Sequence, residues 1–168
     1  MADSQRRAHL PRSTRAATPI DLSALTSLVG FSVRIAQLHV YDHFHRELWR
    51  RHHVHPGAYS ALMVIQSNPG IRPGELAAAL VVKRPNMTKL LDSLERRGWI
   101  ARQTPKHDGR GVSLMLTLAG TRKVERFASD AALMDREATD GLSGRERAEL
   151  LKLLGKLSAG VKRVKGRE

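Results

Sequence analysis

Apolar residues recur at helical spacing through most of the chain. From 21 to about 51 they return every three or four positions, which predicts a long first helix. Shorter helices are predicted over 56–67, 73–80 and 85–97, and each of them has a proline at its first position. A proline is tolerated there because the first backbone N–H of a helix has no partner within the helix. The middle of the chain is therefore expected to contain three short helices in a row.

The spacing changes from helical to alternating after the third of these helices. Residues 99–104 and 112–117 alternate with a period of two and are separated by a polar turn, which predicts a two-stranded hairpin. Helical spacing returns over 118–139. Ser143 and Glu146 then form a capping-box signature for a last helix. This order predicts a mainly α-helical fold with a small β-hairpin wing: a winged helix-turn-helix flanked by helices at both ends.

The net charge of the chain narrows the class of binding partner. The 168 residues include 29 Lys and Arg against 16 Asp and Glu, a formal net charge of +13. Such an excess favours a polyanion, either nucleic acid or an acidic membrane surface. A membrane is the weaker alternative, because no apolar run approaches the roughly 18 residues that span a bilayer. The chain has no cysteine, which is compatible with the reducing cytoplasm where we expect the protein.

The helix predicted over 85–97 has an apolar stripe and a polar surface. Met87, Leu90, Leu91 and Leu94 form the stripe, which we expect to be buried. The opposite surface presents amide, hydroxyl and cationic groups near the start of the helix, as contacts to base edges and phosphates in a major groove require. The candidate DNA-binding residues on and before this helix are Arg72, Arg84, Asn86, Thr88, Lys89 and Ser93.

The tip of the hairpin adds three more candidates: Lys106, Asp108 and Arg110. An arginine on a narrow turn can enter a minor groove, where the negative potential is strong. An aspartate two residues earlier can hold its guanidinium by a charge-assisted hydrogen bond. Over 72–110 there are nine Lys and Arg against four Asp and Glu, so the excess of positive charge extends through this region.

Three motifs resemble the MarR family of transcriptional regulators: GELA at 74–77, MTKLLDSLERRGWI at 87–100 and DGR at 108–110. The resemblance implies that the helix over 85–97 reads the major groove and that Arg110 reads the minor groove. It also implies that the first and last helices form a dimer. The sequence Lys83-Arg84-Pro85-Asn86 departs from the family's common pattern of an acid followed by Ser or Thr, and Arg72-Pro73 stands where a Ser or Thr cap is common. The operator is therefore expected to differ from the commonest one.

The last helix carries an apolar seam at alternating steps of four and three, which is suited to packing along another helix. The candidate dimer-interface residues are Leu25, Leu150, Leu154, Leu157 and Val161. The expected partner is a second copy of the chain, and the homodimer would read a palindrome. The alternative, that the terminal helices fold back on their own domain, stays open.

These expectations divide the chain into five segments by role. They are a flexible basic arm (1–19), an N-terminal dimerisation helix (20–55), the winged helix-turn-helix DNA-binding domain (56–117), C-terminal dimerisation helices (118–164) and a basic tail (165–168).

A cavity with aromatic walls and a cationic edge is predicted from Arg34, His39, His43, Trp49 and Tyr59. Such a cavity suits a small organic anion as effector. The segment SLVGFSVR at 27–34 also resembles family members that sense aromatic acids or their acyl-CoA thioesters.

Zinc is the alternative effector, because His39 and His43 are four residues apart on one helix face. Few acids lie nearby and cysteine is absent, so we favour solvated or pocket-lining histidines and expect neither a metal nor a cofactor. The motifs of common hydrolases and nucleotide-binding enzymes are missing, which argues against an enzyme. The sequence thus predicts a ligand-responsive repressor that a small organic anion releases from DNA. A non-specific architectural DNA-binding protein remains an alternative.

Overall fold

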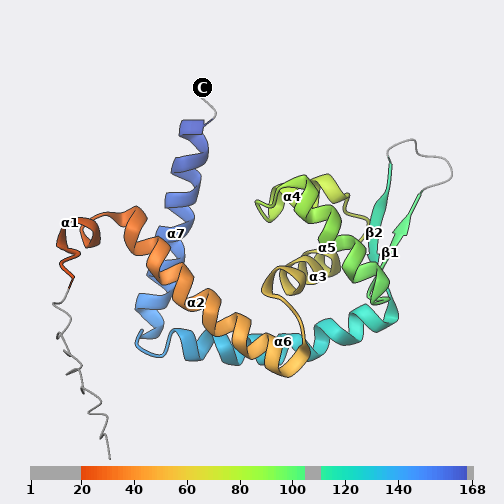
Figure 1. The fold of residues 1–168 in the computed structure, drawn as a ribbon, viewed down its shortest axis with the longest axis horizontal. Coiled ribbons are helices and arrows are strands. Elements are labelled where there is room, and N and C mark those ends of the chain that lie inside the picture. The colour runs from red at the N-terminus through yellow and green to blue at the C-terminus, as the bar shows by residue number, and fades with distance from the viewer. Residues whose placement is uncertain (1–19, 105–110, 166–168) are drawn as a thin grey trace, which may run out of the picture. The chain divides into compact units, whose positions relative to one another are not determined.

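The computed structural model describes residues 20–104 and 111–165, with only the backbone for 162–165. The chain divides into two units, 1–36 and 37–168. Figure 1 shows the order of the elements, which are α1 (Ser23–Thr26), α2 (Val29–His52), α3 (Pro56–Ser67), α4 (Pro73–Ala79), α5 (Arg84–Arg96), β1 (Ile100–Gln103), β2 (Ser113–Leu116), α6 (Leu118–Ala138) and α7 (Gly144–Lys165). The predicted basic arm lies outside the described residues, as do the hairpin tip and the last three residues of the tail.

The helix predicted from 21 to 51 is interrupted in the first unit. Helix α1 ends and α2 begins three residues further on, so the prediction of one continuous helix was wrong here. Around the break, Ser27 Oγ donates to the carbonyl of Ala24 (3.3 Å) and Ser32 Oγ donates to the carbonyl of Thr26 (3.2 Å). Hydroxyl groups that bond to nearby carbonyls compete with the hydrogen bonds of a helix. Helix α2 starts in the first unit and continues into the second.

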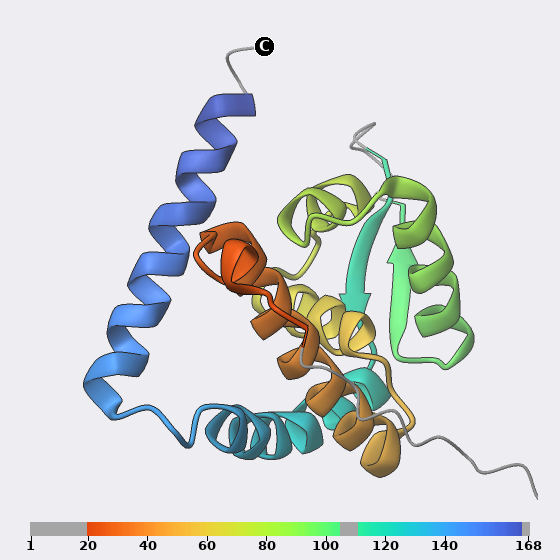
Figure 2. The ribbon, with the colours of Figure 1, turned by 60° about the vertical axis from the view of Figure 1, so that its left-hand side comes forward.

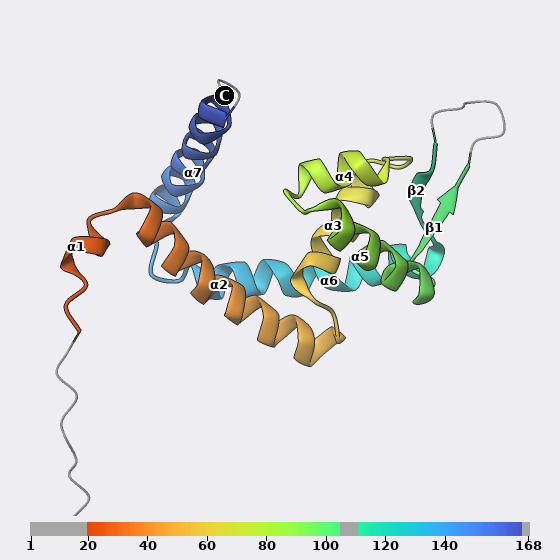
Figure 3. The same cartoon turned by 45° about the horizontal axis from the view of Figure 1, so that its top comes forward.

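Helix α3 is the centre of the second unit. It packs against α6 on one side and against α4 and α5 on the other, as Figures 1 and 3 show. His55 caps its start, because Nδ1 of this histidine accepts a hydrogen bond from the N–H of Gly57 (3.3 Å). The two strands are antiparallel and β1 lies beside α5 (Figure 2). The predicted fold class, a winged helix-turn-helix flanked by helices, is confirmed.

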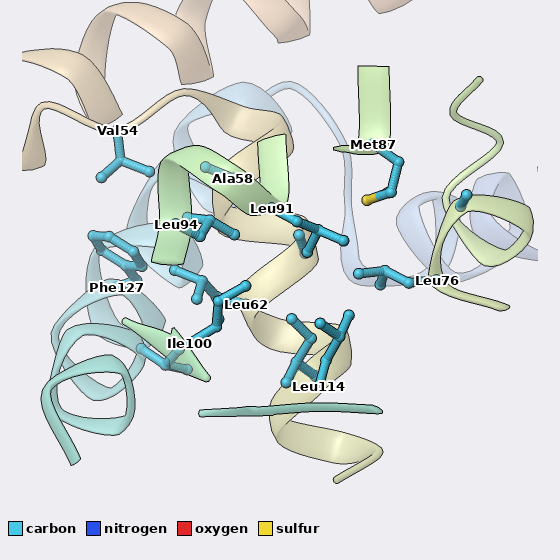
Figure 4. Packing of buried hydrophobic residues seen from close by; sticks show 14 residues of the cluster. Val54, Ala58, Leu62, Leu76, Met87, Leu91, Leu94, Ile100, Leu114 and Phe127 are labelled. Carbon is cyan, nitrogen blue, oxygen red and sulfur yellow. The ribbon is translucent and has the colours of Figure 1, made fainter. Parts of the chain in front are cut away.

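Apolar side chains from four helices, both strands and the connection before α3 form the main core (Figure 4). Met87, Leu91 and Leu94 of α5 are each 1% exposed, whereas Leu90, also expected inside, is only half-buried. Burying one such side chain contributes roughly 1.5–3 kcal/mol. The buried residues of this core are Val54, Ala58, Ala61, Leu62, Ile65, Leu76, Ala77, Met87, Leu91, Leu94, Ile100, Leu114, Val124 and Phe127.

The loop before α4 fixes the hairpin in place. The N–H of Gly70 donates to the carbonyl of Leu114, and the N–H of Leu114 donates to the carbonyl of Ile71, both at 2.9 Å. These bonds satisfy backbone groups of β2 that the two-stranded sheet leaves open. Helix α4 and the wing are therefore joined through one short stretch of chain.

A second buried cluster joins the C-terminal part of α2 to α6. Leu48 packs with Ala131 and Met134 there. Close by, Nε2 of His52 lies 2.7 Å from a carboxylate oxygen of Asp130. Beyond α6, the predicted capping box is present at the start of α7, where Ser143 and Glu146 exchange hydrogen bonds.

A prediction concerns Gly120, at the start of α6. Its N–H donates to Thr117 Oγ1 (3.0 Å), and a Cβ at this position would overlap the carbonyl oxygen of Trp99. Gly120→Ala must therefore shift the backbone, and we expect its free energy of unfolding in urea to fall by about 2 kcal/mol or more. Gly155→Ala is the control, because a Cβ there meets nothing within 4 Å and alanine is the better helix former. Equal stability of both variants would contradict this account.

Candidate nucleic-acid interface

The first turns of α5 expose the predicted base-contacting side chains. Arg84, Asn86, Thr88 and Lys89 are all exposed, and Ser93 is half-exposed. Asn86, Lys89 and Ser93 are spaced three and four residues apart, so they share one face of the helix. Because the opposite face is fixed in the core, these groups are presented on a rigid element.

The hydroxyl hydrogen of Thr88 is already used in a hydrogen bond within α5. Its hydroxyl donates to the carbonyl of Arg84, four residues earlier, at 3.1 Å. The oxygen therefore remains available as an acceptor, and the methyl group remains available for an apolar contact. An acceptor suits the amino group of cytosine or adenine, and a methyl group suits thymine.

Arg72 stands at the start of α4 and is exposed. Its backbone N–H donates to a carboxylate oxygen of Glu75 at 2.9 Å, which is half of a capping box. The acid thus supplies the half of the box that accepts from the N-cap backbone, whereas the half that a Ser or Thr side chain would supply is not made by an arginine, which has no acceptor. The arginine side chain is not needed for the cap and remains free for a phosphate.

Arg102 of β1 is paired with two acids of α5. Its guanidinium lies 2.6 Å from an Asp92 oxygen and 3.1 Å from a Glu95 oxygen. The pairs tie the wing strand to the helix, and the one positive charge of Arg102 is shared between the two carboxylates. Sequence analysis included Arg102 only in the count of basic residues over 72–110, and a contact between a helix and a strand leaves no local signal that would have shown the pairing.

The cations at the start of the helix-turn-helix differ from Arg102 in having no acidic partner among the described residues. Within residues 20–104 and 111–165, no ion pair involves Arg72, Lys83, Arg84 or Lys89. Negative charge near α5 is therefore compensated toward its C-terminal end, while positive charge remains at its N-terminal end. This asymmetry suits an approaching phosphate backbone.

Trp99 organises two further cations at the far end of α5. The Arg97 guanidinium carbon lies 4.9 Å from the ring centroid, and Lys123 Nζ lies 5.3 Å from it. Burial lowers the pKa of Lys123, and the nearby positive charges of Arg126 and Arg97 lower this pKa further. We attribute a structural role to Arg97 and Lys123, which sequence analysis did not identify.

The predicted wing-tip residues Lys106, Asp108 and Arg110 lie outside the described residues. They belong to the connection between β1 and β2.

A groove of about 320 Å³ lies elsewhere in the second unit, between α2, α3 and α6. Burial raises the pKa of its Tyr59 hydroxyl. The hydroxyl of Tyr41, also in the wall, lies 2.8 Å from Nε2 of His55. Burial lowers the pKa of His55, and the nearby His45 lowers it further. The lining residues are Gln37, Val40, Tyr41, Phe44, Pro56, Tyr59, Ser60 and Asp135.

Only one of the predicted effector residues of the second unit lines this groove, namely Tyr59. His39 is exposed and outside the lining. Nε2 of His43 lies 3.3 Å from a Glu137 oxygen, and Trp49 stacks on a neighbouring histidine. Arg34 belongs to the first unit. The sequence analysis missed Tyr41 and Phe44, although Gln37, Tyr41 and Phe44 follow one another at helical steps of four and three.

The described part of the chain contains no group of three or more His, Asp or Glu side chains placed to hold one metal ion. Nor does any helix within it have the length and apolar character needed to cross a membrane.

The predicted dimer-interface residues are solvent-exposed in the single chain. Leu150, Leu154, Leu157 and Val161 expose apolar surface along α7, and Leu25 does so in the first unit. An ion pair between Arg147 and Asp135 links the start of α7 to α6.

A helix-turn-helix with an exposed basic start of its second helix, held beside a β-hairpin, defines a winged-helix DNA-binding protein. Residues 54–111 match the sequence model of the MarR family. The chain is 33% identical over 129 residues to a putative transcriptional regulatory protein for the hcr operon of Thauera aromatica, covering 77% of this chain and 78% of that one. This chain belongs to the MarR family of DNA-binding transcriptional regulators.

Solved structures agree with this assignment. The repressor CouR bound to a 23-mer DNA duplex superimposes with a TM-score of 0.78 at 30% identity, over 84% of this chain and 99% of that one. CouR bound to p-coumaroyl-CoA gives a TM-score of 0.73 at 29% identity, over 83% and 98%. A mutant MarR from E. coli complexed with operator DNA gives 0.73 at 26% identity, over 82% and 99%.

The Arg102 ion pairs predict a charge effect on DNA binding. Arg102→Gln leaves two uncompensated carboxylates on α5, so we expect affinity for a duplex of mixed sequence at low salt to fall about tenfold. Arg136→Gln on α6 removes the same charge away from α5 and should change affinity less than twofold. Fluorescence anisotropy measures both, and the difference should shrink as salt is added. Equal losses in the two variants would refute a local effect.

Proposed function

We propose that this chain is a ligand-responsive repressor. A homodimer binds a palindromic operator, and a small aromatic carboxylate or its CoA thioester releases it. The observation that carries the proposal is the start of α5, where an amide, hydroxyls and cations that form no ion pair among the described residues project from a helix whose other face is buried.

The side chains divide between base reading and phosphate binding. Asn86 suits a bidentate contact with adenine, while Arg84 and Lys89 suit guanine or phosphate. Thr88 and Ser93 add shorter polar contacts. Arg72 and Lys106 bind phosphates, and Arg110, held by Asp108, enters the minor groove beside the recognition helix.

The dimer is proposed from the exposed apolar seam of α7. This helix has 22 residues, so it is about 33 Å long. A second copy packed along Leu150, Leu154, Leu157 and Val161, with Leu25 contributing from the first helix, would bury this surface. Two recognition helices would then read half-sites about one helical turn apart. In this proposal, segments 20–55 and 118–164 serve dimerisation and 56–117 binds DNA.

The groove between α2, α3 and α6 is the proposed effector site. Its volume of about 320 Å³ falls in the range of small-ligand sites, and Tyr41, Phe44 and Tyr59 supply aromatic walls. The charge of Asp135 in the lining is compensated by Arg147, which lowers the cost of admitting an anion. CouR, which binds p-coumaroyl-CoA, supports the chemical class of the ligand.

The proposed release of the protein from DNA follows from the position of this groove. It joins α2, a proposed dimerisation helix, to α3, which packs against both helices of the DNA-binding motif. A ligand that binds better to a conformation with misspaced recognition helices shifts the population away from the DNA-bound form.

The proposal predicts that selection from random duplexes recovers an inverted repeat. With Asn86→Ala, we expect discrimination at one symmetric pair of base positions to fall about tenfold, because a bidentate base contact is lost. Arg72→Ala is the comparison, because loss of a phosphate contact weakens binding to all sequences alike and reduces the salt slope by about one. Recovery of no preferred sequence would favour a non-specific architectural protein instead.

The effector site predicts binding of aromatic ligands that a bulkier groove residue prevents. Calorimetry should detect p-coumarate or p-coumaroyl-CoA, with acetyl-CoA as the non-aromatic comparison. Ser60→Leu fills part of the groove and should weaken ligand binding about tenfold or more while operator affinity stays within twofold. Ser129→Leu, on an exposed part of α6, should change neither. Failure of all aromatic acids and thioesters to bind at millimolar concentration would reject this site.

A further inference from the structure

The turn between α4 and α5 contains a residue that suits its backbone poorly. Helix α4 ends in a Schellman motif: the N–H of Val82 donates to the carbonyl of Ala77 (2.9 Å), and the N–H of Val81 donates to the carbonyl of Ala78 (3.3 Å). In this motif the residue after the helix cap adopts a left-handed conformation. Val81 occupies that position with φ of 54°.

Valine is among the least suitable residues for this conformation. Glycine adopts it without a steric penalty, whereas a β-branched side chain crowds the backbone. Within residues 20–104 and 111–165, His53 is the other non-glycine residue with positive φ. A strained residue persists where something other than local backbone preference retains it.

Packing within the chain does not explain the valine. Its side chain is 83% exposed, whereas the next residue, Val82, packs against the main core. The apolar contact that usually accompanies a Schellman motif is therefore supplied by Val82. Neither the backbone nor the interior of the protein gains from an isopropyl group at position 81.

The surroundings of Val81 point to DNA. It lines a shallow groove of about 570 Å³ together with small residues of α4 and with Lys83 and Arg84. These two exposed cations begin the helix that carries the proposed base contacts. An apolar group beside phosphate-binding cations, at the entrance to a major groove, meets one apolar partner on the base edges, the 5-methyl group of thymine.

We propose that Val81 is a specificity-determining residue whose isopropyl group packs against the 5-methyl group of a thymine in each operator half-site. This inference rests on the proposed function and adds a base preference that the polar residues of α5 do not supply. Burial of one methyl group corresponds to about a fourfold gain in affinity.

The test combines a protein variant with thymine-to-uracil substitution, which removes only the methyl group. For the wild-type protein, uracil at one symmetric thymine position of the selected operator should weaken binding about fourfold. Val81→Gly should bind the thymine operator about as weakly as the wild type binds the uracil operator, and should be insensitive to uracil there. Val81→Asn, which also tolerates the left-handed conformation, should behave in the same way.

Two controls separate a DNA contact from a structural role. Both Val81 variants should melt at or above the wild-type temperature, because the strain is relieved. Leu118→Ala removes a comparably exposed apolar group, 70% exposed, at the start of α6, and should leave DNA affinity and uracil sensitivity unchanged.

The results distinguish this inference from the proposed function. If no operator is selected, the proposed function fails. If an operator is bound but uracil has the same effect on wild-type protein and Val81→Gly at every position, the thymine contact alone is refuted. A lower melting temperature of both variants would also refute it, because the valine would then serve the fold.

Discussion

One face of α5 is buried in the main core, and this packing constrains the other elements of the DNA-binding motif. Met87, Leu91 and Leu94 hold this helix against α3 and the hairpin with almost no exposed area. A helix fixed in this way cannot rotate, so the direction of every side chain on its other face is set. The selective contacts proposed for Asn86 and Lys89 require that the apolar face of the helix be immobile.

Electrostatics adds a second constraint to this framework. Arg102 pairs with both Asp92 and Glu95 and offsets part of the negative charge of α5 near the wing. The Glu75 carboxylate accepts a hydrogen bond from the backbone N–H of Arg72 at the start of α4. The acids of this region thus stabilise its own elements, and the cations at the start of α5 are left to face a polyanion. In the proposed function, fold stability and DNA attraction depend on different charges in the same small region.

The proposed regulation depends on the connection between the groove and α3. The groove is bounded by helices that belong to the proposed dimer and DNA-binding parts, and α3 also packs against α4 and α5. A well-packed core transmits displacement because it has few voids to absorb it. A ligand that moves α2 against α3 would therefore alter how the two recognition helices of a dimer are spaced.

The order of the elements, their approximate bounds and the polar surface of α5 could be predicted from residue spacing, because helical and alternating periods are local properties. The family could be predicted too, through motifs that lie within a short stretch. The three-dimensional structure was needed to show that Arg102 is paired and that Trp99 contacts two cations. It was also needed to show that Tyr41 and Phe44 rather than His39, His43 and Trp49 join Tyr59 around the groove. It also revealed the break between α1 and α2 and the left-handed backbone of Val81. These features depend on which distant residues are in contact, or on the backbone conformation that tertiary packing imposes. Residue spacing along the chain predicts neither of them.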